Sequence, residues 1–279
     1  MIKIATIAGS DASGGAGLEA DLKTFEEYGL YGMAAVTLVA TMDPDNEWSH
    51  KVFPLDEDAL RSQLETVFKG VGAAAAKSGM LGSFYAVDLT QEYIDKYKIK
   101  NYVLDPVMVC KGSSGEALNP ELNTAVEKKL LPLAEVATPN LFEAEQLSGL
   151  KEISTVEQMK EAARIIHGKG ARQVFIKGGA KLREAVTGSR PKAIDLYYNG
   201  KEFKILEEKL VKTEWNHGAG CTTSAAIAAG LARGLTVLDA VVLAKKFITS
   251  SLKAGFALNR WVGPGNPSAW RKDCCLFGI

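Results

Sequence analysis

The sequence predicts an α/β protein in which helices cover both faces of a mostly parallel sheet. Short apolar segments alternate along the chain with longer segments whose apolar residues recur at helical spacing. Such alternation is typical of parallel strands joined by crossover helices. The 279 residues are 47% hydrophobic, which is enough for one large domain with a full core. We therefore expect residues 1–279 to form a single domain.

Six segments are short, apolar and followed by turn residues, and we expect them to be strands: residues 2–8, 34–40, 73–77, 102–105, 136–138 and 174–177. Between them, amphipathic spacing predicts helices over residues 16–28, 58–68, 87–97, 121–131 and 156–169. After Lys177 the pattern changes. Residues 194–198 and 203–206 flank Asn199-Gly200, which predicts a hairpin with a two-residue turn. Helices over residues 219–233 and 237–256 close the chain.

Charge and composition exclude several classes of protein. The 33 basic and 33 acidic residues balance, so the chain offers no strong field for nucleic acid or a membrane surface. No apolar run approaches the roughly 20 residues that span a bilayer. The first apolar segment, Met1–Ala8, is too short and too strand-like to be a signal peptide. The four cysteines, Cys110, Cys221, Cys274 and Cys275, show neither metal-site nor disulfide spacing. We expect a cytoplasmic protein with free thiols and no nucleic-acid or membrane partner.

The segment from Asn216 to Ser224, Asn-His-Gly-Ala-Gly-Cys-Thr-Thr-Ser, runs directly into a predicted helix. Small residues free the backbone amides there, and the positive end of the helix dipole points at the same place, so the segment predicts an anion site. Cys221 lies where the anion would develop, as a nucleophile or a base. The alternative is a tight loop in which Cys221 is a small buried residue.

In an open α/β sheet, ligands bind beyond the carboxyl ends of the strands. The residues that follow the predicted strands are rich in chemistry: Gly9–Gly17, Thr41-Met42-Asp43, Ser78–Leu81, Asp105–Met108, Pro139–Glu143 and Lys177-Gly178-Gly179. The first of these segments lacks the ending of a P-loop and fits Gly-x-Gly-x-x-Gly poorly. It is either a plain turn between strand and helix or a close approach of backbone to a small substrate.

The set of motifs resembles one family. Ala8-Gly9-Ser10-Asp11, Gly14–Gly17, Ala20–Thr24, Asp105–Met108, Thr138-Pro139-Asn140 with Glu143, Lys177–Gly179 and His217–Thr222 look like the hydroxymethylpyrimidine kinase and pyridoxal kinase branch of the ribokinase-like superfamily. Order and spacing match from about Ile4 to Ala244. Residues 265–279 carry no motif of that branch and stay unassigned.

The resemblance implies a three-layer α/β/α domain that transfers the γ-phosphoryl group of ATP, with Mg²⁺, to a hydroxymethyl group on a small aromatic ring. Such a transfer needs an amide cradle, a base and a divalent cation. The amides of Gly218, Ala219, Gly220 and Cys221 match the cradle. Cys221 stands where most superfamily members carry an aspartate base, and a helix N-terminus should lower its pKa from about 8.5 toward neutrality.

Four further residues receive roles from the resemblance, each with a structural alternative. Lys177 would meet ATP phosphates, or it ends a strand at the surface. Asn140 and Glu143 match an Asn-x-x-Glu element that holds Mg²⁺ through water, or they form a helix capping pair. Asp105 orients Mg²⁺ or ends a strand.

The same carry-over places six residues around the aromatic ring: Asp11, Gly17, Asp21, Met42, Met80 and Val107. Pyrimidine kinases typically have glutamine where this chain has Met42, which cannot read a pyrimidine edge by amide hydrogen bonds. They usually have alanine where this chain has Cys110, beside a polar glycine-rich segment at residues 111–115 that we expect to form a lid.

Cys110 and Cys221 together resemble the dual-cysteine pyridoxal kinases. We expect Cys110 to add to the pyridoxal aldehyde as a hemithioacetal while Cys221 activates the hydroxymethyl group; the alternative is that Cys110 is an incidental small residue. His217 is expected to shape its loop or contact phosphate, and His50 to cover the ring or a neighbouring site.

Three functions remain open on the sequence. The first is a pyridoxal kinase of vitamin B6 salvage that also takes pyridoxine or pyridoxamine. The second is a hydroxymethylpyrimidine or hydroxymethylpyrimidine-phosphate kinase of thiamine synthesis. The third is a non-catalytic vitamin-binding protein. Met42 and Cys110 favour the first, and family members are commonly homodimers.

Overall fold

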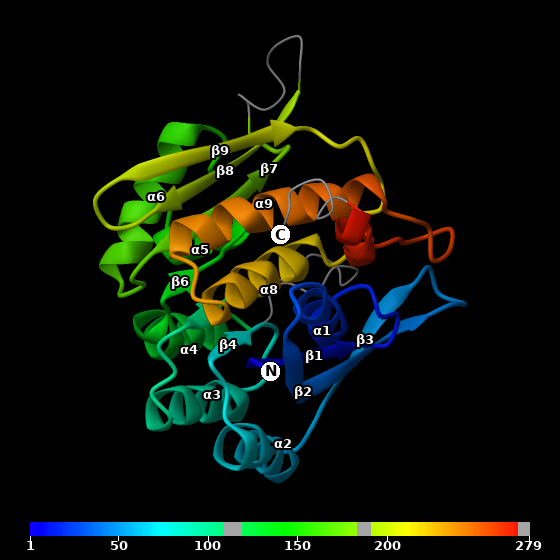
Figure 1. Ribbon diagram of the computed structural model, residues 1–279, viewed down its shortest axis with the longest axis vertical. Helices are drawn as coiled ribbons and strands as arrows, with labels where there is room; N and C mark the ends of the chain where they lie inside the picture. Colours follow the sequence, from blue (N-terminus) through cyan, green and yellow to red (C-terminus); the bar gives the residue numbers. More distant parts are fainter. Residues whose placement is uncertain (109–118, 183–190, 273–279) are drawn as a thin grey trace.

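A nine-stranded sheet runs through the protein in the computed structural model, which describes residues 1–108, 119–182 and 191–272 (Figure 1). Its order is β3-β2-β1-β4-β5-β6-β7-β8-β9. The strands are β1 (Lys3–Asp11), β2 (Tyr31–Asp43), β3 (Ser49–Pro54), β4 (Ala75–Ser78), β5 (Tyr102–Leu104), β6 (Val136–Ala137), β7 (Val174–Gly179), β8 (Lys192–Tyr198) and β9 (Phe203–Lys209).

The six central strands, β2 to β7 in sheet order, are parallel, and β3, β8 and β9 pair antiparallel at the two edges. Strand β1 is buried on both faces, with Ile4, Ala5, Ile7 and Ala8 each at most 1% exposed. Parallel strands need this burial because their crossover helices cover both faces. The predicted mostly parallel sheet is confirmed.

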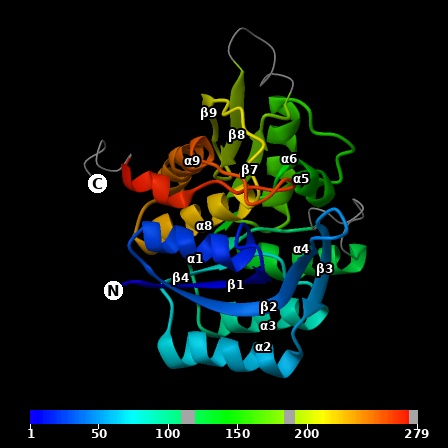
Figure 2. The same ribbon diagram turned by 90° about the vertical axis from the view of Figure 1, so that its right-hand side faces the viewer.

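Helices cover the sheet on both sides, and Figure 2 shows the resulting layers edge-on. One face carries α1 (Gly17–Glu27), α8 (Ala219–Ala232) and α9 (Val237–Lys253). The other carries α2 (Glu57–Leu64) with its π-helical continuation to Val71, α3 (Phe84–Lys96), α4 (Pro120–Leu130), α5 (Leu141–Ser148) and α6 (Val156–Gly168). This is the three-layer α/β/α arrangement that the resemblance implied.

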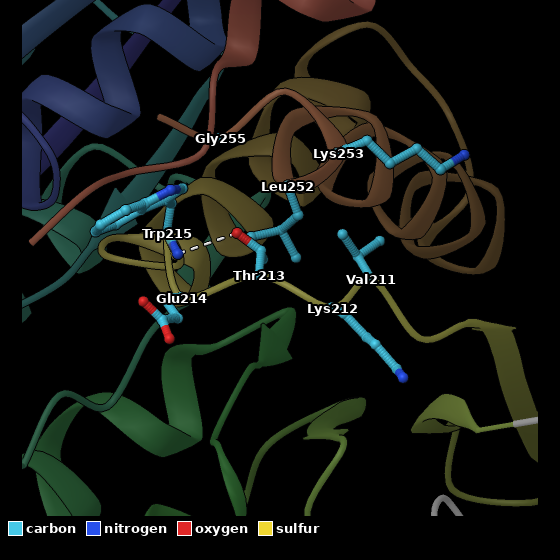
Figure 3. Close-up of a pocket in the computed structure, with 8 residues that line it drawn as sticks. All are labelled: Val211, Lys212, Thr213, Glu214, Trp215, Leu252, Lys253 and Gly255. Carbon is cyan, nitrogen blue, oxygen red and sulfur yellow. Dashed lines mark hydrogen bonds between the residues drawn. The ribbon is translucent and has the colours of Figure 1, made fainter. Parts of the chain in front are cut away.

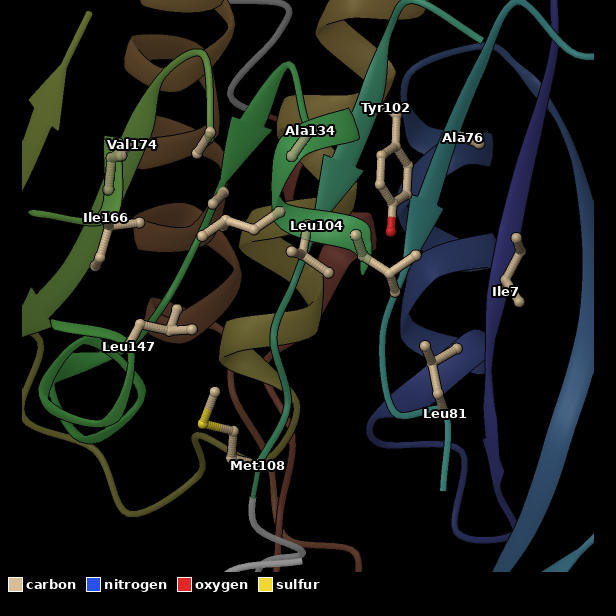
Figure 4. Packing of buried hydrophobic residues seen from close by; sticks show 14 of the residues in the cluster. Ile7, Ala76, Leu81, Tyr102, Leu104, Met108, Ala134, Leu147, Ile166 and Val174 are labelled. Atoms are coloured by element: carbon tan, nitrogen blue, oxygen red, sulfur yellow. The ribbon is translucent and has the colours of Figure 1, made fainter. Parts of the chain in front are cut away.

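Each face has its own core. Leu104, Ile166, Val174 and Leu147 pack together under the second group of helices (Figure 4). On the opposite face α8 is buried almost all round and packs against both α1 and α9. A helix that is apolar on every side needs such cover. The start of α8 is thereby held firmly at the carboxyl edge of the sheet.

The second strand is longer than the sequence predicts. It continues to Asp43 and pairs with β3, which places Met42 opposite His50. No strand was expected at β3 because its side chains are polar or exposed and lack an apolar face. The edge hairpin adds two residues, Met42 and His50, to the neighbourhood of the strand ends.

The predicted two-residue turn between β8 and β9 is wrong. Tyr198 pairs with Phe203, so residues 199–202 form a four-residue loop in which Gly200 has a φ of 90°. The Asn199 side chain accepts hydrogen bonds from the amides of Lys201 and Glu202, at 2.9 and 2.7 Å. This side-chain turn closes the loop in place of two residues with positive φ.

The C-terminal segment that the sequence left unassigned docks onto the helical layer as far as Lys272. Trp270, 4% exposed, packs its ring against Phe247 of α9, and the guanidinium of Arg271 pairs with Glu27 of α1. Cys110, Cys274 and Cys275 lie outside the described residues, as does the predicted lid at residues 111–115. None of the helices in the described ranges combines the length and apolarity that a membrane crossing requires.

Candidate functional site

A cavity of about 680 Å³ lies where the parallel strands end. Strands β1, β2 and β4 line one part of it, while β7, β8 and α9 line another, and the start of α8 contributes the segment from Asn216 to Cys221. Thirteen residues predicted from the sequence line this cavity: Asp11, Gly17, Met42, Met80, Asp105, Val107, Asn140, Glu143, Lys177, Gly218, Ala219, Gly220 and Cys221. The fold therefore brings together side chains from distant parts of the chain.

The loop before α8 depends on Gly218. This residue is the N-cap of α8 with a φ of 72°, and a Cβ there would lie 2.0 Å from the Gly15 carbonyl oxygen. Only glycine fits so close an approach between the two glycine-rich loops. The amides of Gly220 and Cys221 belong to the first helical turn, where no carbonyl of the helix can bond them. They are available to an anion in the cavity.

The predicted cradle of four amides needs one correction. The Ala219 amide donates a 3.1 Å hydrogen bond to the Asn216 carbonyl, so it is already engaged in the loop. The bond closes the turn that leads into α8, which the sequence pattern did not reveal.

Cys221 lies in the wall of the cavity with the Gly17 amide donating to its sulfur. Burial raises the pKa of the thiol to about 11, against the opposing effect of the Lys77 ammonium. The expected fall of the Cys221 pKa toward neutrality is wrong, because burial disfavours the thiolate more than the Lys77 ammonium favours it.

Lys177, which is partly buried, and the buried Asp105 form an ion pair at 2.7 Å near the start of α8. A Cβ at Gly220 would lie 3.4 Å from the Lys177 ammonium, so this cation faces the anion loop. Ser224, one turn along α8 from Gly220, donates a 2.9 Å hydrogen bond to the other oxygen of Asp105. Burial opposes the charge on Lys177, but Asp105 and Glu143 outweigh it and raise the pKa of the ammonium. The cation stays charged and fixed.

Asn140 and Glu143 form a capping box at the start of α5. The Asn140 side chain accepts from the Glu143 amide at 2.9 Å, and Glu143 accepts from the Asn140 amide at 2.8 Å. Burial raises the pKa of Glu143 to about 7, since the carboxylate loses its hydration. Asn140 and Glu143 therefore form the helix capping pair that was the structural alternative to Mg²⁺ binding. Glu143 also lines the cavity.

The donor set fits a hydrated Mg²⁺ better than an ion held by the protein alone. Within the described ranges no three metal-binding side chains come together. Mg²⁺ keeps several waters and takes one or two carboxylates beside substrate phosphates, and Glu143 offers one such carboxylate. Asp105 accepts one hydrogen bond on each oxygen, from Lys177 and from Ser224, and its role as a second ligand stays a prediction.

Asp11 and His217 connect the two glycine-rich loops. The His217 Nε2 atom lies 2.6 Å from an oxygen of Asp11, whose carboxylate also accepts from the amides of Ser13 and Ala16. Burial opposes ionisation of Asp11, but hydrogen bonds from His217 and Ser13 outweigh it and lower the pKa to about 2. His217 thus shapes its loop, one of the two roles expected for it.

Met42, Met80 and Val107 line the cavity near the ends of β2, β4 and β5, and His50 joins them from β3. Asp21 does not line the cavity, so its predicted position around the aromatic ring is wrong. It is fully buried in α1, where it accepts two hydrogen bonds from Lys77 and one from Thr6. Lys77, which the sequence analysis missed, lines the cavity in its place. A lysine that ends an apolar strand ordinarily faces water, so nothing in the local sequence indicates its burial.

A smaller cavity of about 580 Å³ adjoins the larger one (Figure 3). Val211, Lys212, Thr213 and Leu252 line both cavities. In Figure 3 the Trp215 amide donates a 3.0 Å hydrogen bond to the Thr213 hydroxyl, which fixes the segment between them. The two cavities therefore share part of their wall.

A model of the phosphomethylpyrimidine kinase family matches residues 11–266. The chain belongs to the phosphomethylpyrimidine kinase family. It is similar to a putative pyridoxine kinase of Treponema pallidum (strain Nichols), at 55% identity over 97% of this chain and 98% of the relative. The match spans both proteins almost completely.

Solved structures agree with the family assignment. The ADP complex of Bacillus subtilis pyridoxal kinase superposes with a TM-score of 0.92 at 50% identity, covering 97% of this chain and 99% of that one. The Staphylococcus aureus pyridoxal kinase in complex with AMP-PCP and pyridoxal has a TM-score of 0.90 at 46% identity, covering 98% and 95%. The predicted ribokinase-like fold of this phosphomethylpyrimidine kinase family member is confirmed.

Proposed function

We propose that the protein is an ATP-dependent pyridoxal kinase, which phosphorylates the 5′-hydroxymethyl group of pyridoxal, and also of pyridoxine or pyridoxamine, in vitamin B6 salvage. One observation carries the proposal. A single cavity brings the amides at the start of α8, the Lys177 cation and the Glu143 carboxyl beside Cys221 and Met42. The similarity to kinases solved with ADP, and with AMP-PCP and pyridoxal, supports both substrates.

The transfer step uses few groups of this chain. Cys221 accepts the proton of the substrate hydroxyl in its thiolate form, which its raised pKa makes the minor form near neutral pH. An S–H bond forms as the O–H bond breaks. The freed oxygen bonds to the γ-phosphorus while the bond from phosphorus to the bridging oxygen breaks and ADP leaves with the electron pair. The amides of Gly220 and Cys221 and the ammonium of Lys177 stabilise the charge on the transferring group.

Bound Mg²⁺ would neutralise charge on the nucleotide phosphates. Glu143 is the residue that would hold it, through a water molecule. Asp105 fixes the Lys177 ammonium 2.7 Å away and would also orient the ion.

Substrate choice rests on Met42 and Cys110. Met42 lines the cavity, where we place it against the ring, and it lacks the amide that would read a pyrimidine. For Cys110, outside the described residues, we keep the hemithioacetal with the pyridoxal aldehyde as part of the proposal. Membership of the phosphomethylpyrimidine kinase family favours a second candidate, hydroxymethylpyrimidine or hydroxymethylpyrimidine-phosphate kinase activity.

A non-catalytic vitamin-binding protein would not need a base, a cation and a metal-binding carboxyl together. Cys221, Lys177 and Glu143, which could serve these roles, all line the cavity and favour the kinase. The single domain over residues 1–279, the cytoplasmic location and the homodimer belong to the proposal as further expectations.

The proposal is tested by Mg²⁺-dependent ADP release with pyridoxal, pyridoxine and hydroxymethylpyrimidine, each repeated with Cys221→Ala. Strong pyridoxal turnover that the substitution abolishes is the expected result. Turnover with hydroxymethylpyrimidine alone would favour the second candidate, and no turnover with any acceptor would favour the binding protein. Calorimetric titration with pyridoxal separates that last case from an unfolded sample.

A further inference from the structure

Lys77 is the most unusual charged group near the site. Its side chain is 0% exposed at the end of β4, although it contributes to the cavity wall. The ammonium lies 2.9 and 2.8 Å from the two oxygens of Asp21, which accepts a further 2.6 Å hydrogen bond from Thr6. A Cβ at Gly79 would lie 3.1 Å from the ammonium, so this glycine leaves it room beside the cavity.

Stability alone is a weak reason for such a pair. Burying two charges costs several kcal/mol of hydration, and well-packed apolar residues in their place are often equally stable or more so. Neither the predicted motifs nor the proposed transfer step uses Lys77. Its position next to the reacting groups calls for a functional explanation.

Helix α1 contacts both Cys221 and Lys77. The Gly17 amide, at the start of α1, donates to the Cys221 sulfur, and the Asp21 side chain, four residues later, holds Lys77. Helix α8, which carries Cys221, packs against both α1 and β4. Gly17 of α1, Lys77 of β4 and Cys221 of α8 all line the cavity, and α8 packs against the other two elements.

Among the residues that the structure describes, four charged groups act on Cys221. Lys77 from β4 and Lys177 from β7 are cations, whereas Asp21 from α1 and Asp105 after β5 are carboxylates. Lys177 is already paired with Asp105 and faces the anion loop. Among these groups, Lys77 has the largest effect on the thiol and favours its ionised form.

We propose that Lys77 is a positioning residue that stabilises the thiolate of Cys221 through the charge that Asp21 holds fixed beneath the cavity wall. The inference rests on the proposed function, in which that thiolate accepts the proton of the substrate hydroxyl. Lys77 keeps its own proton throughout and transfers none. The substrate proton goes to sulfur, and the adjacent ammonium offsets the cost of placing the thiolate in a buried site.

The test follows the alkylation of Cys221 by iodoacetamide across the pH range in the ligand-free protein. Mass spectrometry of the peptide that carries Cys221 separates it from the other three cysteines. Because the thiolate reacts, Lys77→Met should move the profile to higher pH, and each tenfold fall in the alkylation rate at neutral pH corresponds to a rise of about 1 in the pKa of the thiol. The double variant Lys77→Met/Asp21→Asn, which leaves no unpaired carboxylate, should move the profile in the same direction.

Lys245→Met is the matched control. Lys245 forms a second buried pair, 2.6 Å from Asp195, and it is not among the groups that act on the Cys221 thiol. Its removal should leave the alkylation profile of Cys221 unchanged. An unchanged alkylation profile in folded Lys77 variants would overturn the inference. Loss of folding in both Lys77→Met and Lys77→Met/Asp21→Asn would also overturn it, since the pair of Lys77 and Asp21 would then serve the fold.

Turnover provides the second measurement. In Lys77→Met we expect kcat with pyridoxal to fall while KM for ATP stays within about twofold, because only the proton acceptor is affected. If the wild-type protein phosphorylates no vitamer, the proposed function fails, but the alkylation profile still decides the role of Lys77.

Discussion

Substitution of Gly218 by alanine tests how the anion loop is built. The new Cβ would lie 2.0 Å from the Gly15 carbonyl oxygen and 2.9 Å from the Ala16 Cα, at a φ of 72°. A carbon and an oxygen rest at about 3.3 Å, so the two loops must separate by about 1.3 Å. The left-handed backbone adds about 1 kcal/mol of strain and the crowding about 1 to 3 kcal/mol. We expect unfolding to be easier by about 2 to 4 kcal/mol in total.

Activity should suffer more than stability. The amides of Gly220 and Cys221 move with the loop, and a displacement of about 1 Å in a catalytic group can cost a factor of about 100. We therefore expect kcat/KM for pyridoxal to fall about 100-fold or more in Gly218→Ala, while the protein stays folded at room temperature. Steady-state kinetics and thermal denaturation measure the two effects.

Gly149→Ala is the matched control. Gly149 caps α5 with a φ of 78°, and a Cβ added there would meet nothing within 4 Å. This variant should show the strain alone, about 1 kcal/mol, with activity unchanged. Equal activity of Gly218→Ala and the wild-type protein would refute the reasoning, because the loop contact would then be irrelevant to the anion site.

Three further predictions concern other groups of the site. Burial raises the pKa of Glu143 to about 7, so the affinity for Mg²⁺ should rise about fivefold from pH 6 to pH 7 and about twofold more above pH 7. Calorimetric titration should find this dependence absent in Glu143→Gln, and a flat wild-type profile would contradict it. Burial of Asp11 opposes ionisation, but His217 and Ser13 outweigh it and lower its pKa to about 2; the stabilisation is present above an unfolded value of about 3.8 and is lost as pH falls toward 2. Urea denaturation should thus show a steeper loss of stability at acid pH for the wild-type protein than for Asp11→Asn, and parallel losses would speak against it. Met42→Gln should raise the ratio of hydroxymethylpyrimidine to pyridoxal turnover by about tenfold, and a competition assay in which the ratio stays the same would remove Met42 as a determinant.

Much of the fold follows from hydrophobic pattern. The central parallel strands and the long helices are apolar at regular spacing, and they lie within a few residues of where the sequence predicts them. Strand β3 was missed because Ser49, His50 and Lys51 give it no apolar face, and it exists through pairing with β2. The loop at residues 199–202 was misjudged because the Asn199 side chain supplies hydrogen bonds that a two-residue turn does not need.

The sequence predicted which residues line the site better than it predicted the interactions between them. Asp105, Glu143 and Lys177, from motifs that follow strands, line one cavity as expected. The pairing of Asp21 with Lys77, 56 residues later in the chain, leaves no local mark in the sequence. The direction of the pKa change at Cys221 was also missed, because it depends on burial that only the packed structure fixes.

The most direct test of the proposed function is a competition between acceptors. The protein is incubated with ATP, Mg²⁺ and equal amounts of pyridoxal and hydroxymethylpyrimidine, and the phosphorylated products are separated and identified by mass spectrometry. We predict pyridoxal 5′-phosphate as the main product, with Cys221→Ala forming almost none. A product mixture dominated by hydroxymethylpyrimidine phosphate, or no phosphorylated product, would contradict the proposal.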